Sequence, residues 1–290
     1  MHRRHFLRLA AAAGSVSAVA PAVAAPVPAR FPIGVCDWTI GRTADPEALA
    51  VAGRIGIDGV QVDFGRPADP EEGESLPLLN PAHQTKYLER AGKAGNAAIS
   101  SLALGVLNEI PYKSDPRAER WVLESVEVAK AMGQEIVLLA FFGAGDLRED
   151  PAGIDETVAR LERLAPVAEK AGIVYGIESW LKADVLIGIL DRVGSPNVQV
   201  YYDLGNMHKV GADIYAEIAQ LGRDRICEIH AKDYDDLYGK GSIDFPRAKA
   251  ALDAIGYDGW IVMEGTEMPL GVEESNRYDL EYLRNVFAEE

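Results

Sequence analysis

Eight short apolar segments of strand length recur along this chain, and stretches long enough for a helix separate them. Each segment is bounded by Gly, Asp or Pro, which is typical of buried strands. The segments are Ile33–Cys36, Gly59–Phe64, Ile99–Leu104, Ile136–Phe141, Ile173–Glu178, Val198–Asp203, Ile226–His230 and Trp260–Glu264. Eight repeats of strand and helix predict an α/β fold of the (β/α)8 TIM barrel type.

Three of the intervening stretches carry clear helix signals. Trp121–Met132, Ile154–Ala171 and Phe245–Ile255 each end directly before a glycine, a common helix stop. The competing architecture is a doubly wound open sheet, which usually has a glycine-rich phosphate turn after its first strand. The segment after the first strand here has no such turn. We therefore expect one barrel domain over residues 31–287, without an internal linker.

Four successive segments in the C-terminal half end in a carboxylate or an imidazole: Glu178, Asp203, His230 and Glu264. A parallel barrel brings its strand ends together at one rim. An ionised group that interrupts an apolar run is costly unless it is paired or bound to a metal. Three carboxylates and one imidazole therefore predict a site for one divalent cation. We expect Mn²⁺, while Mg²⁺, Co²⁺, Zn²⁺ and Fe²⁺ also suit these ligand types.

The residues around these four positions resemble the xylose-isomerase-like TIM barrels, a superfamily that includes the sugar phosphate isomerases and epimerases. The resemblance covers residues 31–287 and is carried by Ser179 after Glu178, Tyr202-Asp-Leu-Gly-Asn206, Glu228-Ile-His-Ala-Lys-Asp233 and Gly256-Tyr-Asp-Gly-Trp-Ile-Val-Met-Glu264. It implies one divalent metal held by a Glu, Asp, His, Glu set, and these roles fall on the four residues above. In the ketose epimerases of this superfamily, the two glutamates are also the acid/base pair.

The implied activity is that of a metal-dependent isomerase or epimerase of a sugar or cyclitol, with a small-molecule sugar as its partner. A metal chelated by a carbonyl oxygen and the adjacent hydroxyl stabilises an enediolate. One carboxylate removes the proton next to the carbonyl, and another returns a proton from the opposite face. We expect Glu178 and Glu264 to be the catalytic pair.

Six further residues are candidates for substrate binding: Trp38, Glu109, Trp180, Asn206, His208 and Lys232. Ketohexose epimerases of the superfamily usually carry an arginine near Lys232 and a histidine at the position of Asn206, so this chain departs from them. Simpler roles are helix capping for Asn206, solvent exposure for His208 and pairing of Lys232 with Asp233. The long stretch Gly65–Asn80 follows the second segment, and its length is typical of a binding loop or lid.

The first 25 residues predict a signal peptide of the twin-arginine type. Arg3 and Arg4 precede Phe6 and Leu7, an alanine-rich apolar stretch follows, and residues 22–24 read Ala-Val-Ala. We expect a periplasmic or secreted protein without a membrane anchor, and an ordinary secretory signal is the alternative. Export favours a second interpretation of function, a 3-keto-glycoside lyase or hydrolase with the same metal-enediolate chemistry, because phosphorylated sugars are scarce outside the cytoplasm.

Charge and residue counts argue against other classes. The formal net charge of -16 repels nucleic-acid backbones, so we expect no nucleic-acid partner. The AP endonucleases of the same superfamily need a histidine-rich zinc cluster, and this chain has too few histidines for one. The presence of both glutamates disfavours a non-enzymatic sugar-binding barrel. Cys36 and Cys227 lie on the first and seventh segments, which are not neighbours in an eight-strand barrel, so we expect free thiols. The sequence leaves a homo-oligomer open.

Overall fold

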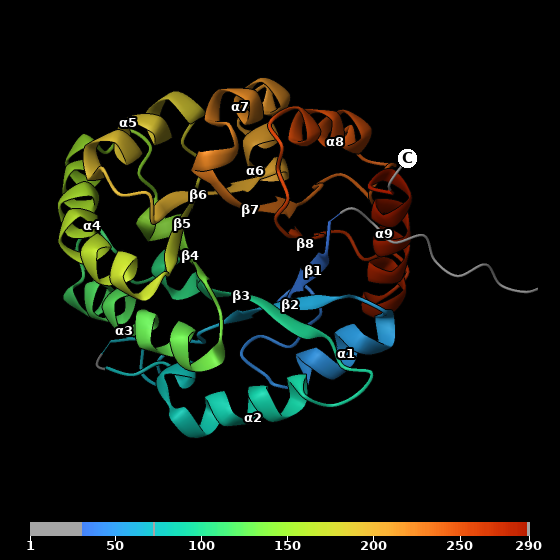
Figure 1. The fold of residues 1–290 in the computed structure, drawn as a ribbon, viewed down its shortest axis with the longest axis horizontal. Coiled ribbons are helices and arrows are strands. Elements are labelled where there is room, and N and C mark those ends of the chain that lie inside the picture. The colour runs from blue at the N-terminus through green and yellow to red at the C-terminus, as the bar shows by residue number, and fades with distance from the viewer. Residues whose placement is uncertain (1–30, 72, 289–290) are drawn as a thin grey trace, which may run out of the picture.

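The computed structural model describes residues 31–71 and 73–288, so the expected signal peptide lies outside the described residues. Eight parallel strands close into a barrel in chain order, with the last strand pairing with the first (Figure 1). The strands are β1 Ile33–Cys36, β2 Gly59–Asp63, β3 Ala98–Leu104, β4 Ile136–Phe141, β5 Val174–Ser179, β6 Val198–Asp203, β7 Ile226–Ala231 and β8 Ile261–Met263. The predicted (β/α)8 architecture is confirmed.

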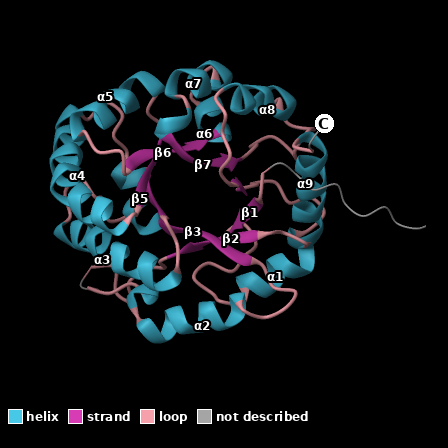
Figure 2. Cartoon of the chain, in the orientation of Figure 1, coloured by secondary structure: helices cyan, strands magenta, loops and turns pink. Residues whose placement is uncertain are grey.

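Helices form an outer ring around these strands, except that the short helix α6 lies inside this ring, next to β7 (Figure 2). They are α1 Ala48–Ile55, α2 Pro81–Ala91, α3 Pro116–Met132, α4 Pro151–Ala171, α5 Ala183–Val193, α6 Leu204–Lys209, α7 Ile214–Leu221, α8 Phe245–Ala254 and α9 Val272–Val286. Short 3₁₀ turns lie at η1 Pro77–Leu79, η2 Gly105–Asn108, η3 Gly143–Gly145 and η4 Arg223–Arg225.

For α3 and α4, the predicted ends agree with the structure better than the predicted starts. Both α3 and α4 end before a glycine in the left-handed conformation, Gly133 and Gly172, as predicted. Both begin earlier than predicted, because Asp115 and Asp150 cap the first turn through their side chains and a proline follows each cap. The expected ends of the other elements differ from the observed ends by about one residue, which is ordinary for such boundaries.

The barrel interior differs on its two sides. Small or aliphatic side chains, Ala103, Leu138 and Ala140, face inward from β3 and β4 and belong to one buried cluster with Tyr201 and Cys227. The four candidate metal ligands lie at the ends of β5 to β8 instead. Small residues on one side of the barrel leave space opposite the charged groups on the other side.

The register of β6 and β7 aligns two of the predicted ligands. The pairing shifts by one residue between Val200 and Tyr201, and beyond this irregularity Asp203 is paired with His230. Such bulges are frequent next to functional sites, where they redirect a side chain. Glu264 was predicted to be the last residue of its strand. The observed strand β8 ends one residue earlier, and Glu264 follows it directly.

The predicted binding loop after β2 is tied to a neighbouring helix. Arg117 of α3 donates to the backbone oxygens of Pro70 and Glu71, and Trp121 donates to that of Glu74. Cys36 and Cys227 are buried free thiols, as expected. Among the residues that the structure describes, no helix combines the length and apolar character needed to cross a bilayer.

Candidate metal centre

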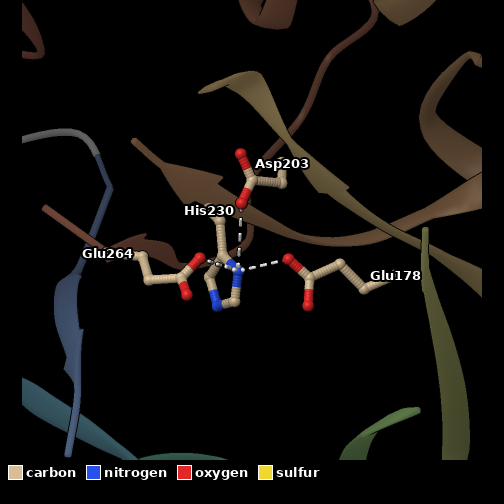
Figure 3. A group of neighbouring side chains, drawn as sticks. All are labelled: Glu178, Asp203, His230 and Glu264. Atoms are coloured by element: carbon tan, nitrogen blue, oxygen red, sulfur yellow. Dashed lines mark hydrogen bonds and ion pairs between the residues drawn. The ribbon is translucent and has the colours of Figure 1, made fainter. Parts of the chain in front are cut away.

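The four predicted metal ligands lie together at the carboxyl ends of neighbouring strands (Figure 3). One ligand atom of each residue lies within 4.8 Å of those of the others. From Nδ1 of His230, the nearest carboxylate oxygens are 3.0 Å away on Glu178, 3.3 Å on Glu264 and 3.8 Å on Asp203. Three oxygens and one imidazole nitrogen at this spacing fit the ligand set of one divalent cation.

Burial makes this concentration of charge costly in the absence of a cation. Burial raises the pKa of Asp203 well above its ordinary value, although the ammonium of Lys232 opposes the rise. Burial would also raise the pKa of Glu264, but Lys232 and His230 outweigh it and hold that pKa well below its ordinary value. For His230, burial favours the neutral ring, yet the facing carboxylates of Glu178 and Glu264 hold its pKa well above its ordinary value. A bound cation would replace the proton on Nδ1.

The other ring nitrogen of His230 contacts a buried polar group deeper in the barrel. Its Nε2 lies 2.9 Å from Oε1 of Gln61 and 3.4 Å from Sγ of Cys36. Nε2 of Gln61 donates to Oγ of Ser101 at 3.1 Å. When Nε2–H is donated to Gln61, the lone pair of Nδ1 faces the three carboxylates, which is the tautomer that a metal ligand requires.

A cavity of about 390 Å³ lies over the cluster. Glu178 and Glu264 line it from the charged side, and Leu138 and Ala140 line it from β4. Its volume falls within the range of roughly 300–1,000 Å³ that is usual for small-molecule sites. The cavity therefore gives a small polar ligand direct access to two of the four candidate ligands.

Lys232 and Trp38 both contact Glu264 inside this cavity. Nζ of Lys232 lies 2.9 Å from Oε2 of Glu264 and 3.6 Å from Oδ2 of Asp203, so it pairs with the cluster rather than with Asp233. Nε1 of Trp38 donates to Oε1 of Glu264 at 3.0 Å. Both oxygens of Glu264 thus have a donor, which fixes the orientation of this carboxylate.

Asn206 lies between two of the candidate ligands. Its Nδ2 donates to Oδ2 of Asp203 at 2.7 Å and lies 3.3 Å from Oε1 of Glu178. The cap of α6 is Asp203, whose Oδ1 accepts from the backbone N–H of Asn206, so the amide side chain is available to the site. The hydroxyl of Tyr234 donates to Oδ1 of Asn206 at 2.5 Å.

The remaining predicted substrate residues take different positions. Trp180 lines the cavity, and the guanidinium of Arg148 lies 4.2 Å from the centroid of its ring. Glu109 is exposed and reaches the cavity through an ion pair with Arg66. His208 is also exposed and lines a neighbouring cavity of about 310 Å³, so its contact with substrate stays a prediction.

Several residues of the site were not predicted from the sequence. Arg66, Asn108, Phe142 and Tyr234 line the cavity, and Gln61 contacts His230. Two of them had a usable signal. Arg66 follows the end of β2 on the same rim, and Gln61 alternates with valines along β2, so that it shares a face with Asp63. The others come from loops whose approach to the site depends on the closed barrel.

The comparison with protein families settles the identity of the fold. The model of the xylose isomerase-like TIM barrel family matches residues 49–286. The chain belongs to this family. The resemblance inferred from the strand-end motifs is therefore confirmed, and the xylose isomerase-like barrel provides the frame for the four candidate ligands.

Two curated relatives are epimerases. A 2-epi-5-epi-valiolone 7-phosphate 2-epimerase from Actinoplanes sp. is 26% identical over 202 residues, which cover 69% of this chain and 72% of the relative. A ketose 3-epimerase from Arthrobacter globiformis is 23% identical over 231 residues, which cover 74% and 79%. Relatives of this kind support an enzyme of the isomerase class that acts on a sugar or cyclitol.

A solved structure shares the same barrel. The apo form of a 3-keto-D-glucoside 4-epimerase from E. coli aligns with a TM-score of 0.71 and 16% sequence identity. The alignment covers 88% of this chain and 99% of that protein. At this identity the likeness establishes the fold of the xylose isomerase-like barrel and nothing finer.

Proposed function

We propose that this chain is a sugar or cyclitol epimerase or isomerase that depends on a divalent cation and transfers protons through Glu178 and Glu264. One observation carries the proposal. The two glutamates approach Nδ1 of His230 from opposite sides and line the same cavity (Figure 3). An epimerase needs a proton acceptor on one face of the substrate and a proton donor on the other.

The proposed cofactor is one divalent cation held by Glu178, Asp203, His230 and Glu264. The donor set of three carboxylates and one imidazole supports a hard or borderline ion, and we favour Mn²⁺ or Mg²⁺. When bound, such an ion polarises the carbonyl and hydroxyl oxygens of a sugar and stabilises negative charge on them. The buried cluster fits this role because its carboxylates otherwise lack enough compensating positive charge.

The chain's own residues supply the proton transfers and the positioning. Trp38 and Lys232 each donate to one oxygen of Glu264, so its carboxylate is held ionised and fixed in direction. Asn206 contacts Glu178 and Asp203 and fixes the opposite side of the cluster. In the forward and reverse reactions of an epimerase, the two glutamates exchange the roles of acid and base.

Incubation of the Mn²⁺-loaded protein with free sugars, sugar phosphates and 3-keto-glycosides in D₂O tests this function. Deuterium at the carbon next to the carbonyl, with no cleavage of the substrate, is the expected result. Absence of deuterium from every substrate, at full metal occupancy, would contradict the proposal. NMR spectra of the same samples distinguish an epimer from an isomer.

A second candidate is the 3-keto-glycoside lyase or hydrolase. The observation that favours it is the neighbouring cavity of about 310 Å³, which shares Tyr234 with the main cavity and offers room for a leaving group. Proton removal next to the 3-keto group would then expel the substituent at the β position. Release of an aglycone in the D₂O experiment would support this candidate over the epimerase.

A further inference from the structure

Both cationic side chains that line the main cavity among the described residues are already paired with carboxylates. Lys232 is 7% exposed, and its Nζ contacts Oε2 of Glu264 at 2.9 Å and Oδ2 of Asp203 at 3.6 Å. A buried ammonium with two carboxylate partners has little remaining capacity to compensate a further anion. Lys232 is therefore suited to hold the catalytic carboxylate and to donate to a neutral hydroxyl.

Arg66 contacts two carboxylates, each through a different nitrogen. Its Nε lies 3.0 Å from Oε1 of Glu109, and its Nη1 lies 3.0 Å from Oδ1 of Asp63. A guanidinium usually binds a phosphate through two parallel N–H groups, one edge at a time. Two of its three nitrogens thus already donate to carboxylates, so a phosphoryl group would have to compete with Asp63 and Glu109 for this cation.

The charges around the cavity also argue against binding of a phosphoryl group. The three carboxylates of the metal cluster balance a divalent cation together with the ammonium of Lys232. Beside them, Asp63 lines the cavity and offsets the charge of Arg66, which the exposed Glu109 faces from outside. Transfer of a phosphate dianion from water into this cavity would therefore leave its charge uncompensated, which is strongly unfavourable.

The rest of the lining suits an uncharged polyol. Thr43, Asn108 and Tyr234 offer neutral hydrogen-bonding groups, and Phe142 and Trp180 offer aromatic surface. The two aromatic rings lie edge to face with their centroids 5.0 Å apart. Neutral donors and acceptors match hydroxyls, and aromatic faces match the C–H surface of a sugar ring.

We infer that the reacting substrate is an uncharged sugar, cyclitol or glycoside without a phosphoryl group, and that the pair Arg66–Glu109 contributes to this selectivity. The inference rests on the proposed function and narrows its substrate class. One relative named above is an epimerase of a phosphate ester and another is an epimerase of a ketose. Family membership therefore does not decide whether the substrate is phosphorylated. The residues that line the cavity of this chain favour a substrate without a phosphoryl group.

Matched pairs of substrates test the inference. We would measure kcat/KM for deuterium incorporation from D₂O with D-fructose and D-fructose 6-phosphate, and with D-ribulose and D-ribulose 5-phosphate. The Mn²⁺-loaded protein should prefer the free sugar of a pair by at least about tenfold, the ratio that a difference of one lost charge-assisted hydrogen bond produces. Equal rates, or faster exchange with the ester, would overturn the inference while leaving the proposed function intact.

Direct binding covers the case in which no sugar of the panel exchanges. That result would count against the proposed function, and calorimetric titration of the same pairs would then test the substrate class alone. Tighter binding of the free sugar supports the inference, and tighter binding of the ester overturns it. If the ester binds more tightly, the variant Lys209→Gln shows where its phosphoryl group lies, because Lys209 lines the neighbouring cavity. Loss of the ester preference in this variant would place the phosphoryl group in that cavity.

The variant Glu109→Gln tests the role of the ion pair. It removes the negative charge that faces Nε of Arg66 while keeping an oxygen acceptor, and should shift the kcat/KM ratio toward the phosphate ester by about two- to fivefold, in line with the strength of an exposed pair. Glu273→Gln is a matched control, because it removes the same charge from an exposed pair with Arg54 on the surface of the barrel. A shift in both variants, or in neither, would overturn the role assigned to Glu109.

Discussion

Nε2 of His230 lies 2.9 Å from Oε1 of Gln61, and both residues are fully buried. This contact joins positions that are 169 residues apart in the chain. It gives the Nε2–H group an acceptor and so leaves Nδ1 to face the three carboxylates of the cluster. The affinity of the proposed metal centre should therefore depend on a glutamine that does not itself contact the metal.

We expect Gln61→Leu to weaken Mn²⁺ binding by about 10- to 100-fold, the usual effect of removing the partner of a histidine ligand. Calorimetric titration measures the affinity. Gln61→Glu retains an acceptor for Nε2–H and should recover part of the loss. Gln84→Leu is the control, because Gln84 is also buried but donates to the backbone of Leu78. Unchanged affinity in folded Gln61→Leu would contradict the assignment.

Glu178→Gln and Glu264→Gln separate metal binding from proton transfer. Glutamine keeps a neutral oxygen of similar shape but does not act as a base near neutral pH. Either change should lower turnover by at least about 10²-fold even when excess Mn²⁺ fills the site. Turnover and metal content must be measured on the same samples. Full occupancy with near-normal turnover in both variants would mean that other residues carry the protons.

Lys232→Ala tests whether the lysine holds substrate and Glu264 without taking part in the proton transfer. We expect KM to rise by a larger factor than kcat falls, because the contact with substrate is lost in the ground state and the transition state alike, while the smaller fall in kcat reflects the lost donor to Glu264. Steady-state kinetics with saturating Mn²⁺ measures both constants. A fall in kcat with unchanged KM would instead assign Lys232 a role in the chemical step.

Asp279 on α9 predicts a pH dependence of stability. Burial raises its pKa from 3.8 to about 7, and Asp233 and Asp236 add to the rise. In the unfolded chain the carboxyl loses its proton first, so its contribution to stability falls as pH rises from about 4 to about 7 and is constant above. Oδ1 of Asp279 accepts from the backbone N–H of Tyr238, a bond that asparagine retains.

We therefore expect Asp279→Asn to gain stability relative to the wild type across this pH range. Urea unfolding of both proteins at pH 4, 5, 6, 7 and 8 measures the difference. Since the other titrating groups are shared, the comparison isolates this carboxyl. A difference that does not change with pH would show that Asp279 has an ordinary pKa.

The leader gives a prediction about location. We propose that residues 1–25 direct export of the folded protein by the twin-arginine route, on the basis of Arg3 and Arg4 and the apolar stretch that follows. Replacement of both arginines by lysine should leave the full-length protein in the cytoplasm, as fractionation and immunoblotting would reveal. Continued export of this variant would favour the ordinary secretory route.

The strands and the four candidate ligands could be predicted because both produce local patterns. Buried parallel strands appear as short apolar runs, and the observed bounds of β1, β4 and β6 agree with the predicted ones. A carboxylate or imidazole at the end of such a run stands out. The starts of α3 and α4 were also encoded locally, in the Asp-Pro pairs at residues 115–116 and 150–151, but the apolar periodicity begins later.

The partners of these residues could not be predicted in the same way. The contact of Gln61 with His230, and that of Arg66 with Glu109, join different strands and loops across the barrel. Periodicity along one segment carries no information about which side chain it meets on another. Only the closed barrel, with its register shift between Val200 and Tyr201, brings these groups to hydrogen-bonding distance.

Titration of the metal-free protein with Mn²⁺ tests the central claim most directly. We expect one ion per chain for the wild type, and at least about tenfold weaker binding when any one of Glu178, Asp203, His230 or Glu264 is replaced by alanine, because each is expected to supply one ligand atom. Glu273→Ala, which lies outside the cluster, should bind as the wild type does. Unchanged affinity in all four ligand variants, or no binding to the wild type, would contradict the claim.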